Sequence, residues 1–310
     1  MNYKFSEISY LSSDGVHTVH AEIYFPKDVT PVGIVEIAHG MVDYVERYRP
    51  LAEFLCEKGY VVAGNDHLGH GKTVNQASEF GFFAEKGGVD FVLADLYEMN
   101  KTLHTNYPTL PIFLLGHSMG SFIARLYAER HPHSISGLII HGTAGPNPLL
   151  PLGKALTAVT ELLRGPMYRS KFVRNLAFSG YNKRFPKEEG HNAWLTRNFE
   201  AVSDKDKDER GGFMFTVSGY RDLFRMLGKS NSRSWFKNYP KSLPTLIVSG
   251  DADPVGDYGK GPAYVYKKLM ISGAERLDLK LYRGARHELF NETNADEVFG
   301  DLYAWLESVK

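Results

Sequence analysis

The stretch Ile112-Phe113-Leu114-Leu115-Gly116-His117-Ser118-Met119-Gly120 decides the fold of this chain, because it predicts a strand, a sharp turn and the start of a helix in succession. The apolar run 112–115 is typical of a strand buried on both faces of a sheet, and residues 121–127 continue as a helix. Gly116 to Gly120 fit the pattern Gly-x-Ser-x-Gly, which is a weak signal until its context agrees. The two glycines let the backbone turn without a Cβ clash. We therefore expect a nucleophile elbow that exposes the hydroxyl of Ser118 above the carboxyl end of the strand.

Outward from this turn, apolar and β-branched runs alternate with helical patterns. The Asp14-Gly15 pair between the first two runs predicts a hairpin. Helical patterns occupy residues 48–58, 89–103, 122–130 and 296–309. The alternation predicts an α/β fold, a mostly parallel eight-stranded sheet flanked by helices. The expected strands are residues 4–11, 17–25, 33–38, 60–63, 112–115, 138–140, 245–248 and 277–282.

Residues 146–240 break the alternation. The segment opens with three prolines and closes with Tyr239-Pro240. We expect a core made of residues 1–145 and 241–310, with 146–240 inserted as a helical cap, or lid, over the sheet.

Two patterns inside the insertion need interpretation. The charge run 204–210 predicts a solvated face. The second pattern is an apolar stripe at helical spacing, for which packing on the core is the favoured interpretation and a surface that contacts lipid or membrane is the alternative. The stripe consists of Leu152, Ala155, Leu156, Val159, Leu162 and Leu163.

A serine hydroxyl needs a base to take its proton, and after a nucleophile elbow the partners follow in the order serine, acid, histidine. Of the twelve histidines, only His287 lies beyond the last expected parallel strands, so it is the predicted base. The loop after strand 245–248 offers Asp251, Asp253 and Asp257 as the acid, and the chemistry of the residues alone does not choose among them. The rigid Pro254 favours Asp253, while Asp251 is expected to accept hydrogen bonds from loop N–H groups.

An oxyanion hole requires two backbone N–H donors. Met119, directly after Ser118, is the first expected donor, and Met41, after the strand 33–38, is the second. Gly40 would allow the loop to approach closely, and His39 is expected to be a structural hydrogen-bonding residue. The histidine-rich loop 65–71 matches no recognised metal-ligand spacing, so we expect hydrogen bonds that shape the loop, and neither metal nor cofactor.

The composition narrows the class of protein. Lys plus Arg and Asp plus Glu each number 36, so nothing in the charge balance favours a nucleic-acid partner. The single cysteine, Cys56, excludes an internal disulfide and fits a reducing compartment. Neither a signal peptide nor a run of 18 apolar residues is evident, so we expect a soluble cytoplasmic protein.

Several of these segments together resemble the monoacylglycerol lipase and lysophospholipase group of α/β-hydrolases, which is related to the S33-type serine aminopeptidases. The resemblance implies hydrolysis of small acyl esters through an acyl-enzyme and a mobile cap over an acyl pocket. It also assigns the acid to Asp253 and supports Met41 and Met119 as oxyanion donors. The matching segments are Ala38-His39-Gly40-Met41, Asn65-Asp66-His67-Leu68-Gly69-His70-Gly71, Gly116-His117-Ser118-Met119-Gly120, Gly250-Asp251-Ala252-Asp253 and Arg286-His287-Glu288.

Two other functions share the same motifs. A serine aminopeptidase or amidase would need acidic cap residues, such as Glu161 or Glu200, to hold an amino terminus. A non-catalytic small-molecule-binding protein would keep the fold without turnover.

Overall fold

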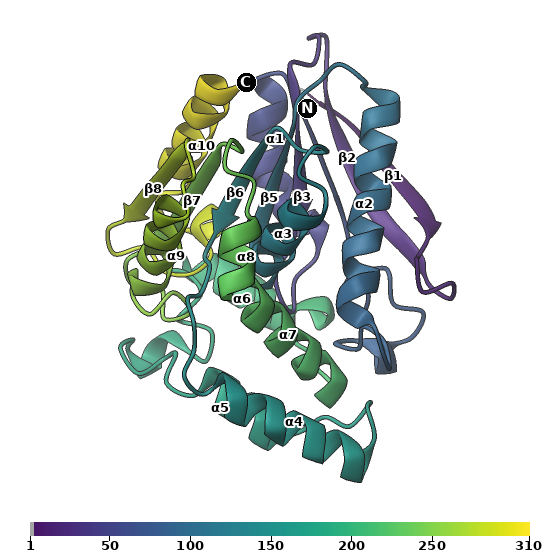
Figure 1. The fold of residues 1–310 in the computed structure, drawn as a ribbon, viewed down its shortest axis with the longest axis vertical. Coiled ribbons are helices and arrows are strands. Elements are labelled where there is room, and N and C mark those ends of the chain that lie inside the picture. Colours follow the sequence, from purple (N-terminus) through teal and green to yellow (C-terminus); the bar gives the residue numbers. More distant parts are fainter. Residues whose placement is uncertain (1–2) are drawn as a thin grey trace.

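A sheet of eight strands runs through the protein in the order β1-β2-β4-β3-β5-β6-β7-β8 (Figure 1). The computed structural model describes residues 3–310, apart from the side chain of Asp206. β2 pairs antiparallel with β1 and β4, and every other neighbouring pair is parallel, which confirms the predicted fold class. The strands are β1 (Tyr3–Leu11), β2 (Thr18–Pro26), β3 (Gly33–Ala38), β4 (Tyr60–Asn65), β5 (Ile112–His117), β6 (Gly137–His141), β7 (Thr245–Gly250) and β8 (Leu277–Tyr282).

Helices cover both faces of the sheet, and the burial of the strands follows from this. Every residue of β3, β4, β5, β6 and β7 is buried, as expected for strands covered on two sides. One face packs against α1 (Arg49–Glu57) and α10 (Ala295–Val309). The other face packs against α2 (Gly88–Asn106), α3 (Met119–Arg130) and α9 (Lys260–Ile271).

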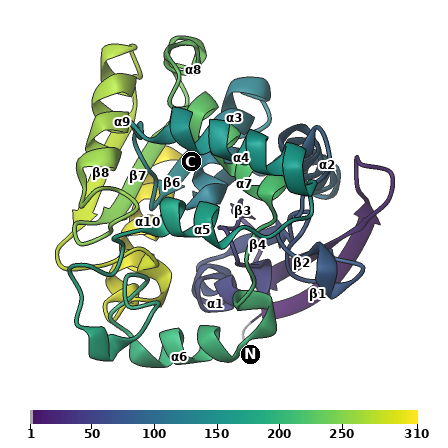
Figure 2. The ribbon, with the colours of Figure 1, turned by 90° about the horizontal axis from the view of Figure 1, so that it is seen from below.

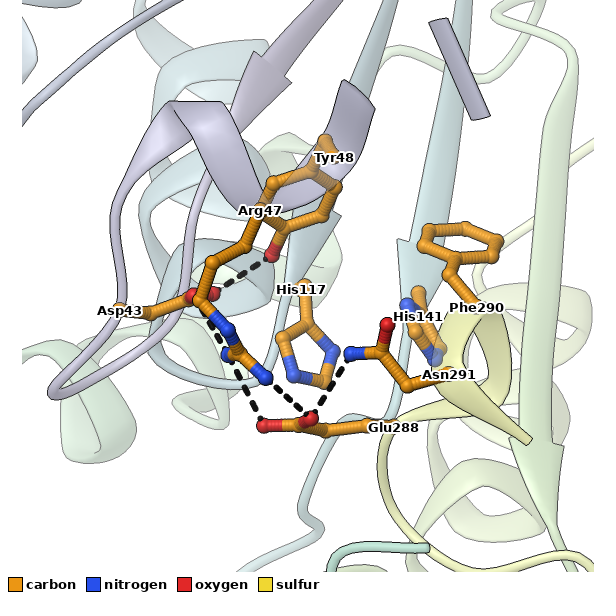
Figure 3. A pocket seen from close by; sticks show the side chains of 8 residues that line it. All are labelled: Asp43, Arg47, Tyr48, His117, His141, Glu288, Phe290 and Asn291. Atoms are coloured by element: carbon orange, nitrogen blue, oxygen red, sulfur yellow. Dashed lines mark hydrogen bonds and ion pairs between the residues drawn. The ribbon is translucent and has the colours of Figure 1, made fainter. Parts of the chain in front are cut away.

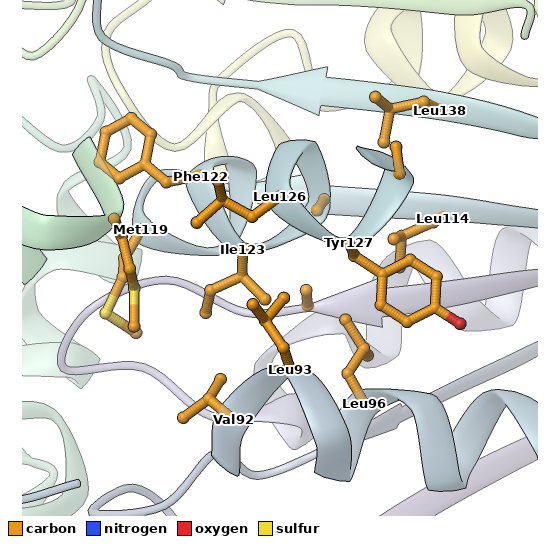
Figure 4. Close-up of a cluster of buried hydrophobic side chains, with 14 of the residues drawn as sticks. Val92, Leu93, Leu96, Leu114, Met119, Phe122, Ile123, Leu126, Tyr127 and Leu138 are labelled. Carbon is orange, nitrogen blue, oxygen red and sulfur yellow. The ribbon is translucent and has the colours of Figure 1, made fainter. Parts of the chain in front are cut away.

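The packing of α2 on α3 shows why these sequences form helices at these places (Figure 4). Val92 and Leu96 of α2 point at Ile123 and Tyr127 of α3, and all four side chains are at most 1% exposed. Val92 and Leu96 are four residues apart, as are Ile123 and Tyr127, so the two residues of each helix lie on the same face of it. This contact anchors the first turns of α3, which begin directly after Ser118.

Short 3-10 helices occur mainly in the connecting segments. They are η1 (Val45–Tyr48), η2 (Ala77–Glu79), η3 (Lys187–Glu189), η4 (Glu209–Gly211) and η5 (Leu289–Asn291).

Five helices lie between β6 and β7, in the segment expected as a cap. Figures 1 and 2 show two of them, α4 and α5, beyond the end of the sheet that is opposite both chain termini. α7 lies between α4 and α3. α8 packs on the core, where the indole N–H of Trp235 donates to the Arg125 carbonyl at 2.7 Å. The five are α4 (Leu150–Arg164), α5 (Lys171–Phe178), α6 (Phe199–Lys207), α7 (Val217–Ser230) and α8 (Arg233–Asn238).

The apolar stripe lies on α4, and the interpretation that it packs on the core is wrong for most of its residues, although the partly buried Leu156 does pack against the core. Leu162 is 85% exposed and Leu163 is 73% exposed, and Leu152 and Val159 are each more than half exposed. α4 instead turns Gly153 and Thr157 towards the protein, and the ideal Cβ of Gly153 would lie 3.0 Å from the Phe224 ring of α7. Helical spacing shows that residues share a face, but it does not show what covers that face.

Among the described residues, none of the helices is both long enough and apolar enough to cross a bilayer.

Candidate active site

Ser118 occupies a strained turn between β5 and α3. Its φ of 52° and ψ of −116° lie in a region that residues with a side chain rarely adopt. Only glycine fits two residues before and two residues after Ser118. An ideal Cβ at Gly120 would lie 1.9 Å from the Ala38 carbonyl oxygen. A Cβ at Gly116 would lie 2.3 Å from the Gly120 carbonyl oxygen. The motif therefore forms a strand–turn–helix elbow with Ser118 at its tip.

The structure brings Ser118, His287 and Asp253 together from three distant parts of the chain. His287 Nε2 lies 2.8 Å from Ser118 Oγ, and His287 Nδ1 lies 2.9 Å from Asp253 Oδ2. Because the carboxylate can only accept, Nδ1–H donates to Asp253 and Nε2 is left to accept from the hydroxyl. His287 is 2% exposed and Asp253 is fully buried, so little water competes for these bonds. The arrangement allows an imidazole to take the serine proton while a carboxylate orients it.

The aspartates of the loop after β7 have different surroundings. Asp253 also accepts from the N–H of Val255 at 2.8 Å, which fixes the carboxylate beside the imidazole. Asp251 is exposed, and its Oδ1 accepts from the N–H of Gly284 at 2.6 Å. Asp257 is also exposed and pairs with Lys260. Of the three, Asp253 is the one that contacts the histidine.

Met41 and Met119, the expected oxyanion donors, lie on two sides of Ser118. Met119 is the first residue of α3, so its N–H has no partner within the helix. The loop of Met41 approaches closely, because an ideal Cβ at Gly40 would lie 3.3 Å from the Ser118 Cβ. Asp43 holds that loop by accepting the N–H of Gly40 at 3.1 Å. Among the hydrogen bonds of the described residues, none uses the N–H of Met41 or Met119, which leaves both for a ligand.

Glu288, the residue after His287, belongs to a buried charge network that the sequence did not predict, and Figure 3 shows it with Arg47 and Asp43. Arg47 Nη1 donates to Asp43 at 2.8 Å, and Arg47 Nη2 donates to Glu288 at 2.7 Å. Lys205 Nζ, from the insertion, donates to the same Glu288 carboxylate at 2.8 Å. Burial alone would raise the pKa of Glu288, but the charges of Arg47 and Lys205 outweigh it and hold this pKa well below its usual range. The network links the Met41 loop, the residue after His287 and helix α6.

The prediction that the charge run 204–210 forms a solvated face is wrong for part of the run. Lys205 is only 9% exposed because it pairs with Glu288, and Arg210 pairs with Glu46 at 3.0 Å. Asp204 and Lys207 are exposed. One face of this charged segment therefore docks on charges of the core, which no local pattern in the sequence indicates.

Two further imidazoles pack near His287. The ring of His117 lies 4.8 Å from the His287 ring and 4.3 Å from the His141 ring. Burial keeps the pKa of His117 well below its usual value and lowers the pKa of His141 to about 3, so both rings are neutral. Together with Asp43, Arg47 and Glu288 of the charge network, they line a cavity of about 10 Å³. That volume suits about one water molecule and excludes an acyl chain.

The histidine-rich loop after β4 forms a separate buried cluster. His39 Nδ1–H donates to the Gly40 carbonyl at 2.8 Å, and His39 Nε2 accepts the N–H of His67 at 2.9 Å. Burial lowers the pKa of His70 to about 3, and it holds that of His67 well below its usual value. The His39 ring thereby joins the loop after β3 to the loop after β4.

Within the described part of the chain, Glu7, His20 and Glu22 are the group whose spacing could hold a metal ion. They lie on β1 and β2, where Lys72 already pairs with Glu7. None of the three contacts the predicted active-site residues.

The two acidic residues that an aminopeptidase was expected to use are placed differently. Glu161 pairs with Arg221, which neutralises its charge, and Glu200 is exposed near the start of α6. Neither provides an unpaired buried carboxylate for an amino terminus.

Comparison with known proteins places this chain among hydrolases. The family model described as serine aminopeptidase, S33, matches residues 29–294. The chain is 28% identical to a monoacylglycerol lipase of Mycolicibacterium smegmatis over 315 aligned residues, covering 98% of this chain and 97% of that protein. It is 26% identical to the human monoglyceride lipase, covering 91% of this chain and 85% of that protein.

A solved structure agrees with the sequence relatives. The thermostable carboxyl esterase of Bacillus coagulans, determined in complex with glycerol, superimposes with a TM-score of 0.92 and 30% identity over 98% of both chains. Because the superposition covers 98% of this chain, the similarity extends over nearly the whole fold, including the segment between β6 and β7.

Proposed function

This chain belongs to the S33 serine aminopeptidase family of α/β-hydrolases, and from that premise we propose that it is a serine ester hydrolase that works through an acyl-enzyme. The observation that carries the proposal is the hydrogen-bonded series from Ser118 Oγ to His287 at 2.8 Å and from His287 to Asp253 at 2.9 Å. In this proposal Ser118 is the nucleophile, His287 the base and Asp253 the acid.

The reaction has two steps of acyl transfer. Ser118 Oγ attacks the ester carbonyl carbon while its proton passes to His287 Nε2. The N–H groups of Met41 and Met119 stabilise the oxyanion, each by roughly 3 kcal/mol in the transition state. The C–O bond then breaks, and His287 gives its proton to the leaving alcohol. In the second step water loses a proton to His287, attacks the acyl carbon, and the acid leaves as the proton returns to Ser118.

The substrates that we propose are monoacylglycerols, lysophospholipids or similar acyl esters. The monoacylglycerol and monoglyceride lipases among the relatives support this choice. The exposed stripe of α4 supports it physically, because a patch of leucines facing solvent is typical of a surface that contacts lipid. Transient contact with a membrane or lipid through this stripe is part of the proposal.

Residues 146–240 form the cap in this proposal. Lys205, from the insertion, contacts Glu288 next to the histidine, so part of the segment reaches the site. The last helix, α8, packs against α3 and extends the core instead. We also propose a cytoplasmic location, supported by the single cysteine, Cys56, which is buried and forms no disulfide.

The experiment compares the wild type with Ser118→Ala. The wild type should hydrolyse p-nitrophenyl butyrate and be labelled at Ser118 by a fluorophosphonate, and the variant should lose both activities while keeping its melting temperature. Unchanged turnover in Ser118→Ala, or a wild type that neither turns over nor is labelled, would reject the proposal. The second result would favour a non-catalytic binding protein.

The substrate class requires a second measurement. Rates on monoacylglycerols and lysophospholipids of increasing chain length should exceed the rate on an aminoacyl anilide. Replacing Leu162 and Leu163 with serine should lower the rate on monoacylglycerol held in vesicles and leave the rate on p-nitrophenyl butyrate unchanged. A higher rate on the anilide would favour the aminopeptidase alternative.

A further inference from the structure

A short segment of the insertion, residues 193–197, is fixed to the loop that carries the histidine base. We call it the clamp segment. Each of its five successive positions forms at least one hydrogen bond with residues 286–292, so the segment is anchored along its full length. Five of these hydrogen bonds, one from each position, run along the segment. They are Arg286 Nη1 to the Ala193 carbonyl (2.6 Å), His287 N to the Trp194 carbonyl (3.4 Å), Glu288 N to the Leu195 carbonyl (2.7 Å), Thr196 Oγ1 to the Asn291 carbonyl (2.8 Å) and Arg197 Nε to Glu292 Oε2 (2.8 Å).

The clamp segment places the indole of Trp194 against the imidazole of His287. The two ring centroids are 5.1 Å apart, with 35° between the ring planes. On its other sides the indole packs against Tyr181, at 5.1 Å, and Phe178, at 6.4 Å. The position of the indole is therefore fixed by the backbone hydrogen bonds of the clamp segment and by packing against Tyr181 and Phe178.

Trp194 differs from the other two tryptophans. The indole N–H of Trp235 donates to the Arg125 carbonyl, and that of Trp305 donates to Asp278. Trp194 instead donates its backbone N–H to Asn182 Oδ1 at 3.1 Å and uses its indole for ring contacts with Tyr181 and His287. What distinguishes its position is the ring contact with His287 and not a hydrogen bond into the core.

The charges around His287 make this ring contact relevant to the reaction. His287 becomes an imidazolium in both steps of the proposed mechanism, and the face of an indole attracts a cation within about 6 Å. Burial keeps the neighbouring His117 and His141 rings neutral, so they do not repel that charge. The Glu288 carboxylate is already paired with Arg47 and Lys205. Asp253, 2.9 Å from Nδ1, and the indole, with its centroid 5.1 Å from that of the imidazole, both contact His287 and can stabilise the cation.

We propose that Trp194 is a positioning residue for His287, an inference that rests on the proposed function. Its indole keeps the imidazole in line between Ser118 and Asp253 and stabilises the imidazolium that forms at each step. The insertion thereby contributes directly to the chemistry as well as covering the site.

The test compares Trp194→Leu with Trp194→Phe on p-nitrophenyl butyrate. Leucine keeps an apolar side chain at this position but has no aromatic face, so kcat should fall about tenfold with little change in KM. Phenylalanine keeps an aromatic face and should restore most of kcat. Equal losses in the two variants, a loss confined to KM, or a leucine variant with wild-type kcat would each overturn the proposal.

Trp305→Leu is the matched control, because it removes an indole from the core far along the chain from the clamp segment. It should lower the melting temperature and leave kcat of the folded enzyme unchanged. A similar loss of kcat in this control would overturn the specific role of Trp194. Failure of this inference is distinguishable from failure of the proposed function, because the latter requires the wild type itself to lack turnover and fluorophosphonate labelling.

Discussion

Lys205 and Glu288 form a buried ion pair, with Nζ 2.8 Å from Oε1, that joins helix α6 of the insertion to the residue directly after the histidine base. The lysine side chain is 8% exposed and the glutamate side chain 6%. Arg47 binds the other side of the same carboxylate and extends the link to Asp43, which holds the Met41 loop. The position of the insertion and the geometry around the candidate active site are thus coupled through one carboxylate.

Removing the charge of Lys205 should destabilise the protein. In Lys205→Met the Glu288 carboxylate keeps Arg47 but loses its second cation in a buried place, so the free energy of unfolding should fall by about 3 kcal/mol. Urea denaturation at pH 7 measures the change. Lys207→Met, which alters an exposed lysine of the same helix, should change stability by no more than about 0.5 kcal/mol.

The pH dependence of this effect has a definite sign. The pKa of Glu288 in the folded state lies well below the ordinary value of 4.5. The stabilisation from its ion pairs is therefore fully present above about pH 4.5 and is lost as the pH falls through the folded-state pKa. The difference between wild type and Lys205→Met should be the same at pH 7 and pH 6 and shrink in more acidic buffer. A difference that grew with acidity would contradict the assignment.

Replacing Asp253 and Asp251 separately distinguishes two of the three aspartates that the sequence left in competition. Asp253→Asn should lower kcat by about 10⁴-fold, because the amide no longer holds the imidazole as an Nδ1–H donor. Asp251→Asn changes only the acceptor for the Gly284 N–H and should leave kcat close to wild type. Steady-state kinetics on a short-chain ester measures both, and the opposite ranking would reassign the acid.

Two glycines should respond in opposite directions to alanine. Gly120→Ala places a Cβ 1.9 Å from the Ala38 carbonyl oxygen, so it should cost about 3 kcal/mol or more and disrupt the elbow. Gly300→Ala, at an exposed position of α10 with no atom within 4 Å of the new Cβ, should raise stability by about 0.5–1 kcal/mol. Thermal unfolding of both variants measures the effect, and a tolerated Gly120→Ala would be inconsistent with the packing of α3 on β3.

Glu36 should make stability decrease as the pH rises. It is fully buried in β3, with Oε2 accepting from Asn100 at 2.6 Å, and burial raises its pKa to about 8. Between about pH 4.5 and 8 the folded state holds a proton that the unfolded state has lost, so stability falls with pH by up to about 1.4 kcal/mol per unit. Glu36→Gln removes this titration.

The stability of Glu36→Gln relative to wild type should therefore increase from pH 5 to pH 8 and level off above that. Urea denaturation at each pH unit provides the measurement. Glu85→Gln, at an exposed position, is the matched control for the effect of replacing a glutamate with glutamine. A flat difference for Glu36→Gln would show that its carboxyl is not protonated in the folded protein.

Some features of the site depend on local sequence, and others do not. Gly116 and Gly120 predict the elbow because the steric demand of the turn acts within a few residues. The position of His287 after the last strands follows from chain order. Asp253 and Asp251 are two residues apart in one loop, so only the path of that loop towards the imidazole separates them. Helical spacing predicted the α4 stripe correctly as one face but did not predict its exposure.

The sequence by itself determined the strand–helix alternation and the residues able to form the elbow, because strand and helix periodicity and glycine sterics act over short stretches of chain. Only the tertiary structure decided that Lys205 is buried in an ion pair with Glu288 and that Trp194 packs on His287. Those contacts join residues 83 and 93 positions apart. Their energies depend on burial and on charges brought together by folding, which no local pattern encodes.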